Sequence, residues 1–141
     1  MIYIEEKSLS RQIELLILLS ENDDYELCAW LYPESPAKEL ANFTVTNNEN
    51  GLVPITSYEN GFKPKRTVLV KATKNNLNAF LINEASLKKN CDSLALYTSG
   101  DLTWKISTIG HEGMCLVQDK SLYSKISKSG FNASLKAPEW W

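Results

Sequence analysis

The chain has 141 residues, within the usual range of one domain, so we expect a single domain covering residues 1–141. Hydrophobic residues make up 43% of it and charged residues 23%, which excludes wholesale disorder, collagen-like repeats and a coiled coil. The net charge of −2 hides an asymmetry, because residues 1–60 hold eleven of the 17 acidic residues but only three of the 15 Lys and Arg residues. The sequence predicts a globular domain whose charges form two faces of opposite sign or are mixed by folding.

Cysteine usage and the N-terminal residues indicate the compartment. Cys28, Cys91 and Cys115 are an odd number without the dense pairing of a small secreted scaffold, so we expect free thiols, at least two of them buried. Residues 1–6 lack the basic segment of a signal peptide. The apolar run at residues 15–19 is far shorter than the roughly 20 residues of a membrane helix. We therefore expect a cytoplasmic protein with no membrane partner.

The first half of the chain predicts one helix followed by strands. Ser8 or Ser10 can cap a helix that ends near Ser20 and carries apolar residues at helical spacing. Leu15 and Leu18 widen its apolar face, which indicates burial on more than one side. The strands that follow are separated by turns rich in Asn, Gly and Pro. They are predicted at residues 25–32, 43–46, 53–55 and 66–72.

Two further helices are predicted in the second half of the chain. Asn75 or Asn76 can cap the first, which ends near Asn90, where an asparagine suits a left-handed cap. The other helix covers residues 121–129 and is closed by Gly130.

The remaining segments of the second half predict strands at residues 94–97, 102–109, 114–117 and 131–135. The first two make a hairpin, which we expect to be half-buried because Leu102, Trp104 and Ile106 alternate with polar residues. The predicted fold class is therefore α+β, with an antiparallel β-sheet (meander) packed against about three α-helices.

One histidine, His111, lies four residues before Cys115. On a helix these two side chains would share a face and could form a thiolate–imidazole pair or two metal ligands. Gly110 and Gly113 favour a turn between strands instead, and the second histidine of a zinc motif is absent from the sequence. The alternative function is thus a small cysteine-dependent hydrolase or transferase, with Cys115 as nucleophile and His111 as base. We expect no cofactor and no metal.

A nucleic-acid-binding module is the third possibility. The cations of residues 62–66 and of Lys71, Lys74 and Lys105 lie near aromatic residues such as Trp104. The isoelectric point of about 5.5, however, is far below the values above about 9 that mark such domains. The composition therefore argues against nucleic acid as a partner.

Acidic and aromatic residues are interleaved in the stretch from Glu21 to Glu39. An acidic surface with aromatic anchors is typical of a protein that binds a basic partner. We expect partner contacts from the following residues: Glu21, Asp23, Asp24, Tyr25, Glu26, Glu34 and Glu39.

In its overall organisation the chain resembles the immunity proteins that bacteria make against delivered toxins, including those of contact-dependent growth inhibition systems. Like them, it is small, slightly acidic and α+β, and it carries no catalytic motif. The resemblance implies a tight one-to-one complex with a cognate toxin domain, often a basic nuclease whose active site is blocked by acidic groups in place of phosphate. Our first hypothesis is a non-enzymatic, protein-binding toxin inhibitor.

The chain ends in two tryptophans, Trp140 and Trp141, each able to bury on the order of 200 Å². They are expected either to fold back as a lid over the face of Leu102, Trp104 and Ile106, or to stay exposed as anchors for a partner.

Overall fold

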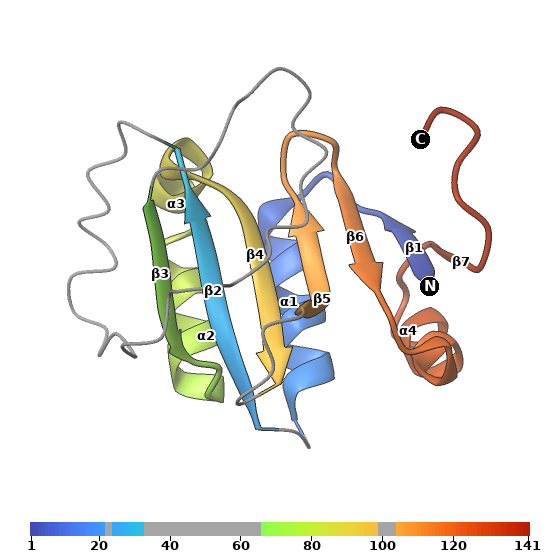
Figure 1. Ribbon diagram of the computed structural model, residues 1–141, viewed down its shortest axis with the longest axis horizontal. Helices are drawn as coiled ribbons and strands as arrows, with labels where there is room; N and C mark the ends of the chain where they lie inside the picture. Colours follow the sequence, from blue (N-terminus) through green and yellow to red (C-terminus); the bar gives the residue numbers. More distant parts are fainter. Residues whose placement is uncertain (22–23, 33–65, 99–103) are drawn as a thin grey trace.

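The computed structural model describes residues 1–21, 24–32, 66–98 and 104–141, which form an open sheet with helices on one face (Figure 1). The described strands follow the order β3-β2-β4-β5-β6-β1-β7, and neighbours pair antiparallel. This confirms the predicted α+β fold, with the meander β4-β5-β6 at its centre. The strands are β1 (Ile2–Glu5), β2 (Tyr25–Leu31), β3 (Arg66–Lys71), β4 (Cys91–Thr98), β5 (Trp104–Ile109), β6 (Met114–Val117) and β7 (Ala133–Ser134). The helices are α1 (Leu9–Ser20), α2 (Lys74–Ile82), α3 (Glu84–Asn90), the 3-10 helix η3 (Lys120–Leu122) and α4 (Tyr123–Lys128).

The main hydrophobic core lies between the sheet and the helices α1, α2 and α3. Helix α1 begins after Ser8, whose hydroxyl accepts a hydrogen bond from the Arg11 backbone N–H at 3.4 Å, as predicted for a cap. Ile13, Leu15 and Leu16 are fully buried, which confirms burial on more than one side of this helix. Each such side chain stabilises the fold by about 1.5–3 kcal/mol.

Two ends of the sheet carry the loops that matter for function, and we name them as they appear in Figure 1. The lower end contains the last residues of α1 and the starts of β2 and α2. The upper end contains the start of α1, the end of β2, the start of β4 and the β5–β6 turn at residues 110–113.

The helix predicted from Asn75 or Asn76 to Asn90 is two helices, α2 and α3. The cap prediction is wrong, because Thr73 caps α2 by accepting a hydrogen bond from the Asn76 N–H at 3.1 Å. The break lies at Asn83, whose side-chain amide donates to the Ala79 carbonyl at 2.7 Å. This local bond satisfies a carbonyl at the end of α2 and lets the chain turn before α3 starts.

Strand β1 was not predicted, although it lies between β6 and β7 inside the sheet. Its residues Ile2 and Ile4 are fully buried and point into the main core. The remaining predicted strands that fall on described residues are present, including the hairpin of β4 and β5.

A β-bulge overturns the predicted half-burial of β5. Leu96 pairs with Ile106, but the next residue, Tyr97, pairs with Trp104, so one residue of β5 is extra. Ile106 therefore lies in the main core, whereas Trp104 packs against the buried Tyr97 cluster on the opposite face of the sheet. Ser107, which was expected on the polar side, is fully buried. The sheet is apolar on both faces along its centre.

The C-terminal elements are shorter than predicted. The helix expected at residues 121–129 is divided into η3 and α4, and Gly130 follows it with a φ of 82°. The strand expected at residues 131–135 is the two-residue β7. The strands predicted at residues 43–46 and 53–55 lie outside the described residues.

The C-terminal tail runs beside β1 rather than over β5. Trp141 packs edge-on against Tyr3, with ring centroids 6.3 Å apart, and Trp140 packs against Trp141. The indoles stay 58% exposed at Trp140 and 44% exposed at Trp141. The tail is therefore no lid over Trp104, while Leu102 lies outside the described residues.

The Gly110 position predicts a steric effect on stability. A Cβ atom there would clash with the backbone carbonyl oxygen of Asp92, which accepts the Gly110 N–H at 2.8 Å. Gly110→Ala should cost about 2–3 kcal/mol of unfolding free energy, the upper part of the range for overpacking, because the clash is with backbone. Gly130→Ala is the control, since φ is positive but space is open, and it should cost about 1 kcal/mol. Thermal unfolding measures both; an equal or smaller loss for Gly110→Ala would contradict the packing argument.

Candidate partner-binding site

The structure brings part of the predicted contact stretch together at the lower end. Glu21 and Asp24 are exposed, Tyr25 is half-buried against the core, and Glu26 is half-buried in β2. The other predicted contact residues, Asp23, Glu34 and Glu39, lie outside the described residues.

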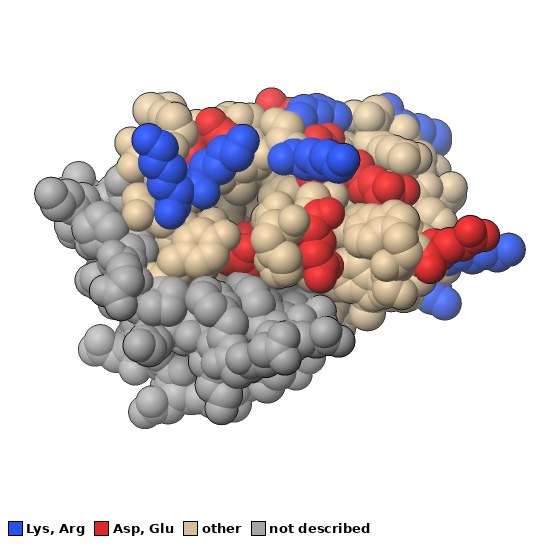
Figure 2. Space-filling view, turned by 90° about the horizontal axis from the view of Figure 1, so that it is seen from above, with Lys and Arg blue, Asp and Glu red and all other residues tan. Residues whose placement is uncertain are grey.

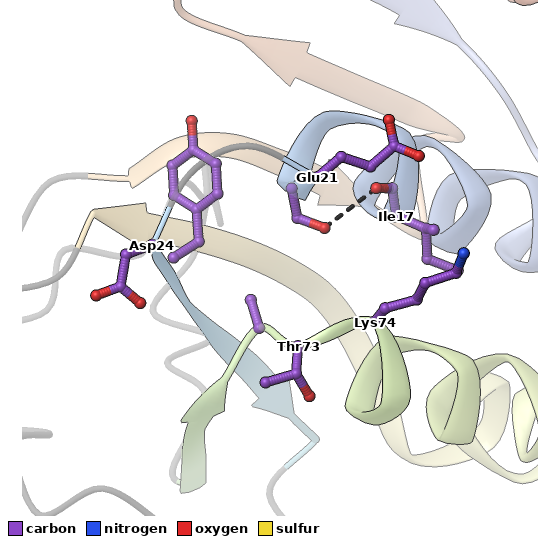
Figure 3. Close-up of a pocket in the computed structure, with 8 residues that line it drawn as sticks. Ile17, Glu21, Asp24, Thr73 and Lys74 are labelled. Atoms are coloured by element: carbon purple, nitrogen blue, oxygen red, sulfur yellow. Dashed lines mark hydrogen bonds between the residues drawn. The ribbon is translucent and has the colours of Figure 1, made fainter.

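Three of these residues line a pocket of about 340 Å³ between the end of α1 and the starts of β2 and α2 (Figure 3). Its wall is secured locally, because the Ser20 hydroxyl donates to the Ile17 carbonyl at 3.1 Å. In Figure 3 Glu21 and Lys74 lie on one side of the pocket and Asp24 on the other. The lining is Ile17, Ser20, Glu21, Asp24, Tyr25, Ala72, Thr73 and Lys74.

A second pocket, of about 410 Å³, lies at the same end of the sheet and is also lined by Tyr25. Asp119 lines it and caps η3 by accepting a hydrogen bond from the Ser121 N–H at 2.8 Å. Hydrogen bonds from the Ser121 side chain and backbone lower the pKa of Asp119, so this carboxylate stays charged. The other lining residues are Thr98, Lys105, Ile106, Val117, Gln118 and Leu122. Sequence reasoning missed Asp119, although an Asp before a helical segment is a recognisable cap signal.

The charges at the lower end are mixed. The Glu21 carboxylate lies 3.6 Å from the Lys125 Nζ, which also donates to the Leu18 carbonyl at 2.8 Å. Lys74 lines the first pocket together with Glu21 and Asp24. Here an acid from the first part of the sequence meets bases from the second, so folding mixes the charges that are separated along the chain.

His111 and Cys115 do not lie on one helix, so their side chains do not share the helical face that a catalytic pair would need. His111 lies in the β5–β6 turn with its Nδ1 atom 2.8 Å from Asp92 Oδ1, whereas Cys115 lies in β6, paired in register with Ile4 and Thr108. Cys115 is fully buried in the main core, and burial raises the pKa of its thiol. The structure thus joins the histidine to Asp92, which sequence reasoning missed.

All three cysteines are free and buried, as predicted. In the described part of the chain, no group of three or more His, Cys, Asp or Glu residues could hold a metal ion. None of the helices described there combines the length and the apolar character needed to cross a bilayer. Of the basic cluster weighed for nucleic acid, Lys74 and Lys105 line separate pockets, and residues 62–65 lie outside the described residues.

Comparisons of the chain with protein-family models, curated proteins and solved structures found no match.

The buried thiols and Tyr32 predict loss of stability at alkaline pH. Burial, with the nearby Asp92 charge, raises the pKa of Cys91 and of Tyr32 to about 12. The unfolded chain therefore releases these protons first, and unfolding becomes easier as the pH rises above about 9. The free energy of unfolding should fall by up to about 1.4 kcal/mol per pH unit for the fully buried Cys91, and by less for the partly buried Tyr32, which solvent screens.

Urea unfolding across this pH range measures the slope. Cys91→Ala should make it shallower, and Tyr123→Phe, at an exposed position, should leave it unchanged. A stability that is flat between about pH 8 and 11 would contradict the expected burial of neutral thiols.

Proposed function

We propose that this chain is a non-enzymatic protein-binding inhibitor of the immunity type, which neutralises a basic toxin domain in the bacterial cytoplasm. The observation that carries the proposal is the arrangement around Tyr25 at the lower end, where this half-buried residue lines two pockets. Exposed carboxylates lie at both pockets, Glu21 and Asp24 at the first and Asp119 at the second.

This arrangement suits Lys and Arg side chains of a partner. An aromatic residue that lines both pockets is the kind of anchor that dominates binding energy in protein interfaces. The pockets admit the long aliphatic parts of Lys or Arg, while the carboxylates bind the cationic ends. The Glu21–Lys125 pair is exposed and worth no more than about 1 kcal/mol, so a partner's guanidinium can replace Lys125 at little cost.

The state of the cysteines favours binding over the cysteine-enzyme alternative. A nucleophilic cysteine needs access to substrate and a lowered pKa, and Cys115 has neither. The His111 imidazole, which would act as the base, is oriented by Asp92 at the upper end.

A growth assay tests the proposal. The protein encoded by the neighbouring gene is expressed in a bacterial host with and without this chain, and growth and complex formation are measured. We expect growth arrest that this chain relieves, together with a one-to-one complex on size-exclusion chromatography. Arrest that persists at full expression of the chain, with no complex, would overturn the proposal.

Charge reversal at the lower end tests the surface. Glu21→Lys with Asp24→Lys should change unfolding free energy by only about 0.5 kcal/mol per site, as exposed substitutions do. It should weaken the complex about tenfold at low salt, mainly through the association rate. The control, Glu5→Lys with Glu139→Lys, changes the net charge equally at exposed positions elsewhere and should bind normally. Equal weakening by both variants would show that only net charge matters.

A further inference from the structure

A smaller pocket, of about 140 Å³, lies at the upper end, opposite the proposed partner surface. Figure 2 views this end from above and shows Lys and Arg side chains next to Asp and Glu side chains, not a patch of one sign. The polar side chains that line the pocket are Lys7, Gln12, Tyr32, Lys88, Asp92 and His111.

The inner wall of this pocket is a fixed polar framework built on Asp92, whose side chain is 2% exposed. Its Oδ1 atom accepts hydrogen bonds from the Tyr32 hydroxyl at 3.2 Å and the His111 backbone N–H at 3.3 Å, and it lies 2.8 Å from His111 Nδ1. Its Oδ2 atom accepts from the Ser93 hydroxyl at 3.0 Å. The carboxyl group is thus occupied by protein donors and holds the imidazole and the phenol in place.

Gln12 is the residue that points to a ligand. It is 1% exposed, and its Nε2 atom donates to the Glu6 backbone carbonyl at 2.6 Å. This bond fixes which end of the amide is oxygen, because the reverse orientation would place two acceptors against each other. No described residue donates a hydrogen bond to the buried Oε1 atom. A buried acceptor needs a donor, and Gln12 is one of the residues that line this pocket.

The charges at the pocket add a second requirement. Lys7 and Lys88 are exposed at its edge, and neither forms an ion pair within the described residues. Their ammonium groups attract an anion, whereas Gln12 Oε1 requires an N–H or O–H group. The volume limits a ligand that meets both requirements to a few heavy atoms.

We propose that this upper pocket binds a small carboxylate that also carries a hydroxyl or amino group, such as a hydroxy acid or an amino acid. The carboxylate lies between the ammonium groups of Lys7 and Lys88, and the hydroxyl or amino group donates to Gln12 Oε1. Ligand binding at this site is independent of the proposed partner surface at the lower end, and it involves no reaction at Cys115.

Three probes of nearly equal size test the donor requirement. Acetate has only the carboxylate, glycolate adds a hydroxyl and glycine adds an amino group. Titration into ¹⁵N-labelled protein, followed by amide NMR shifts, should show glycolate or glycine binding about tenfold or more tightly than acetate, because acetate leaves Gln12 unpaired. The shifts should centre on the Gln12 side-chain amide, Gly110 and His111. Whichever of glycolate and glycine binds more tightly shows whether the ligand's donor group is a hydroxyl or an amino group.

Two neighbouring lysines provide the matched control. Lys88→Ala should weaken binding of the preferred probe about fivefold or more, whereas Lys89→Ala, one residue outside the lining, should leave it unchanged. Gln12→Leu should remove the preference for the probe over acetate. If that variant does not fold, the comparison of Lys88→Ala with Lys89→Ala tests the proposal. Binding of none of the probes, equal binding of acetate, or equal effects of the two lysine variants would overturn the proposal.

Discussion

A buried carboxyl group, that of Asp92, determines how the upper end of the molecule is built. Removing such a group from water is costly unless donors surround it, and here the donors come from three parts of the chain: the end of β2, β4 itself and the β5–β6 turn. The Asp92 backbone carbonyl also accepts the Gly110 N–H, which leaves no room for a Cβ at that position. One residue, Asp92, therefore fixes the geometry of the turn, the orientation of His111 and the wall of the upper pocket.

Much of the fold could be predicted from local sequence, and the misses have physical causes. The Ser8 cap and apolar spacing of α1, and the turn between β5 and β6, depend on residues close together in the chain. Strand β1 has only four residues, and its neighbours β6 and β7 lie more than a hundred residues away, so no local pattern revealed it. The bulge in β5 likewise depends on its pairing with β4.

The candidate sites were harder to predict, because a site is a set of distances between elements. Interleaved charge and aromatic residues drew attention to Tyr25, but its two pockets are closed by α2 on one side and by the segment after β6 on the other. Lys125, which pairs with Glu21, is likewise remote in sequence. His111 was singled out for its spacing to Cys115, whereas its partner, Asp92, lies 19 residues before it and meets it only through the β4–β5 pairing.

The two ends of the sheet differ in the chemistry that they offer, and this difference separates their proposed roles. At the lower end the carboxylates are exposed and the half-buried Tyr25 lines two pockets, so contact with a large partner can bury surface area without leaving a polar group unpaired. At the upper end the polar groups of Asp92 and Gln12 are themselves buried, and the Gln12 Oε1 acceptor lacks a donor among the described residues. Burying that acceptor costs free energy in the unliganded fold, and a small molecule that donates to it recovers this cost on binding. Strand β2 runs from one end to the other, with Tyr25 at its start and Tyr32 directly after its last residue. The central sheet thus holds both sites on rigid backbone, which limits the entropy lost when either ligand binds.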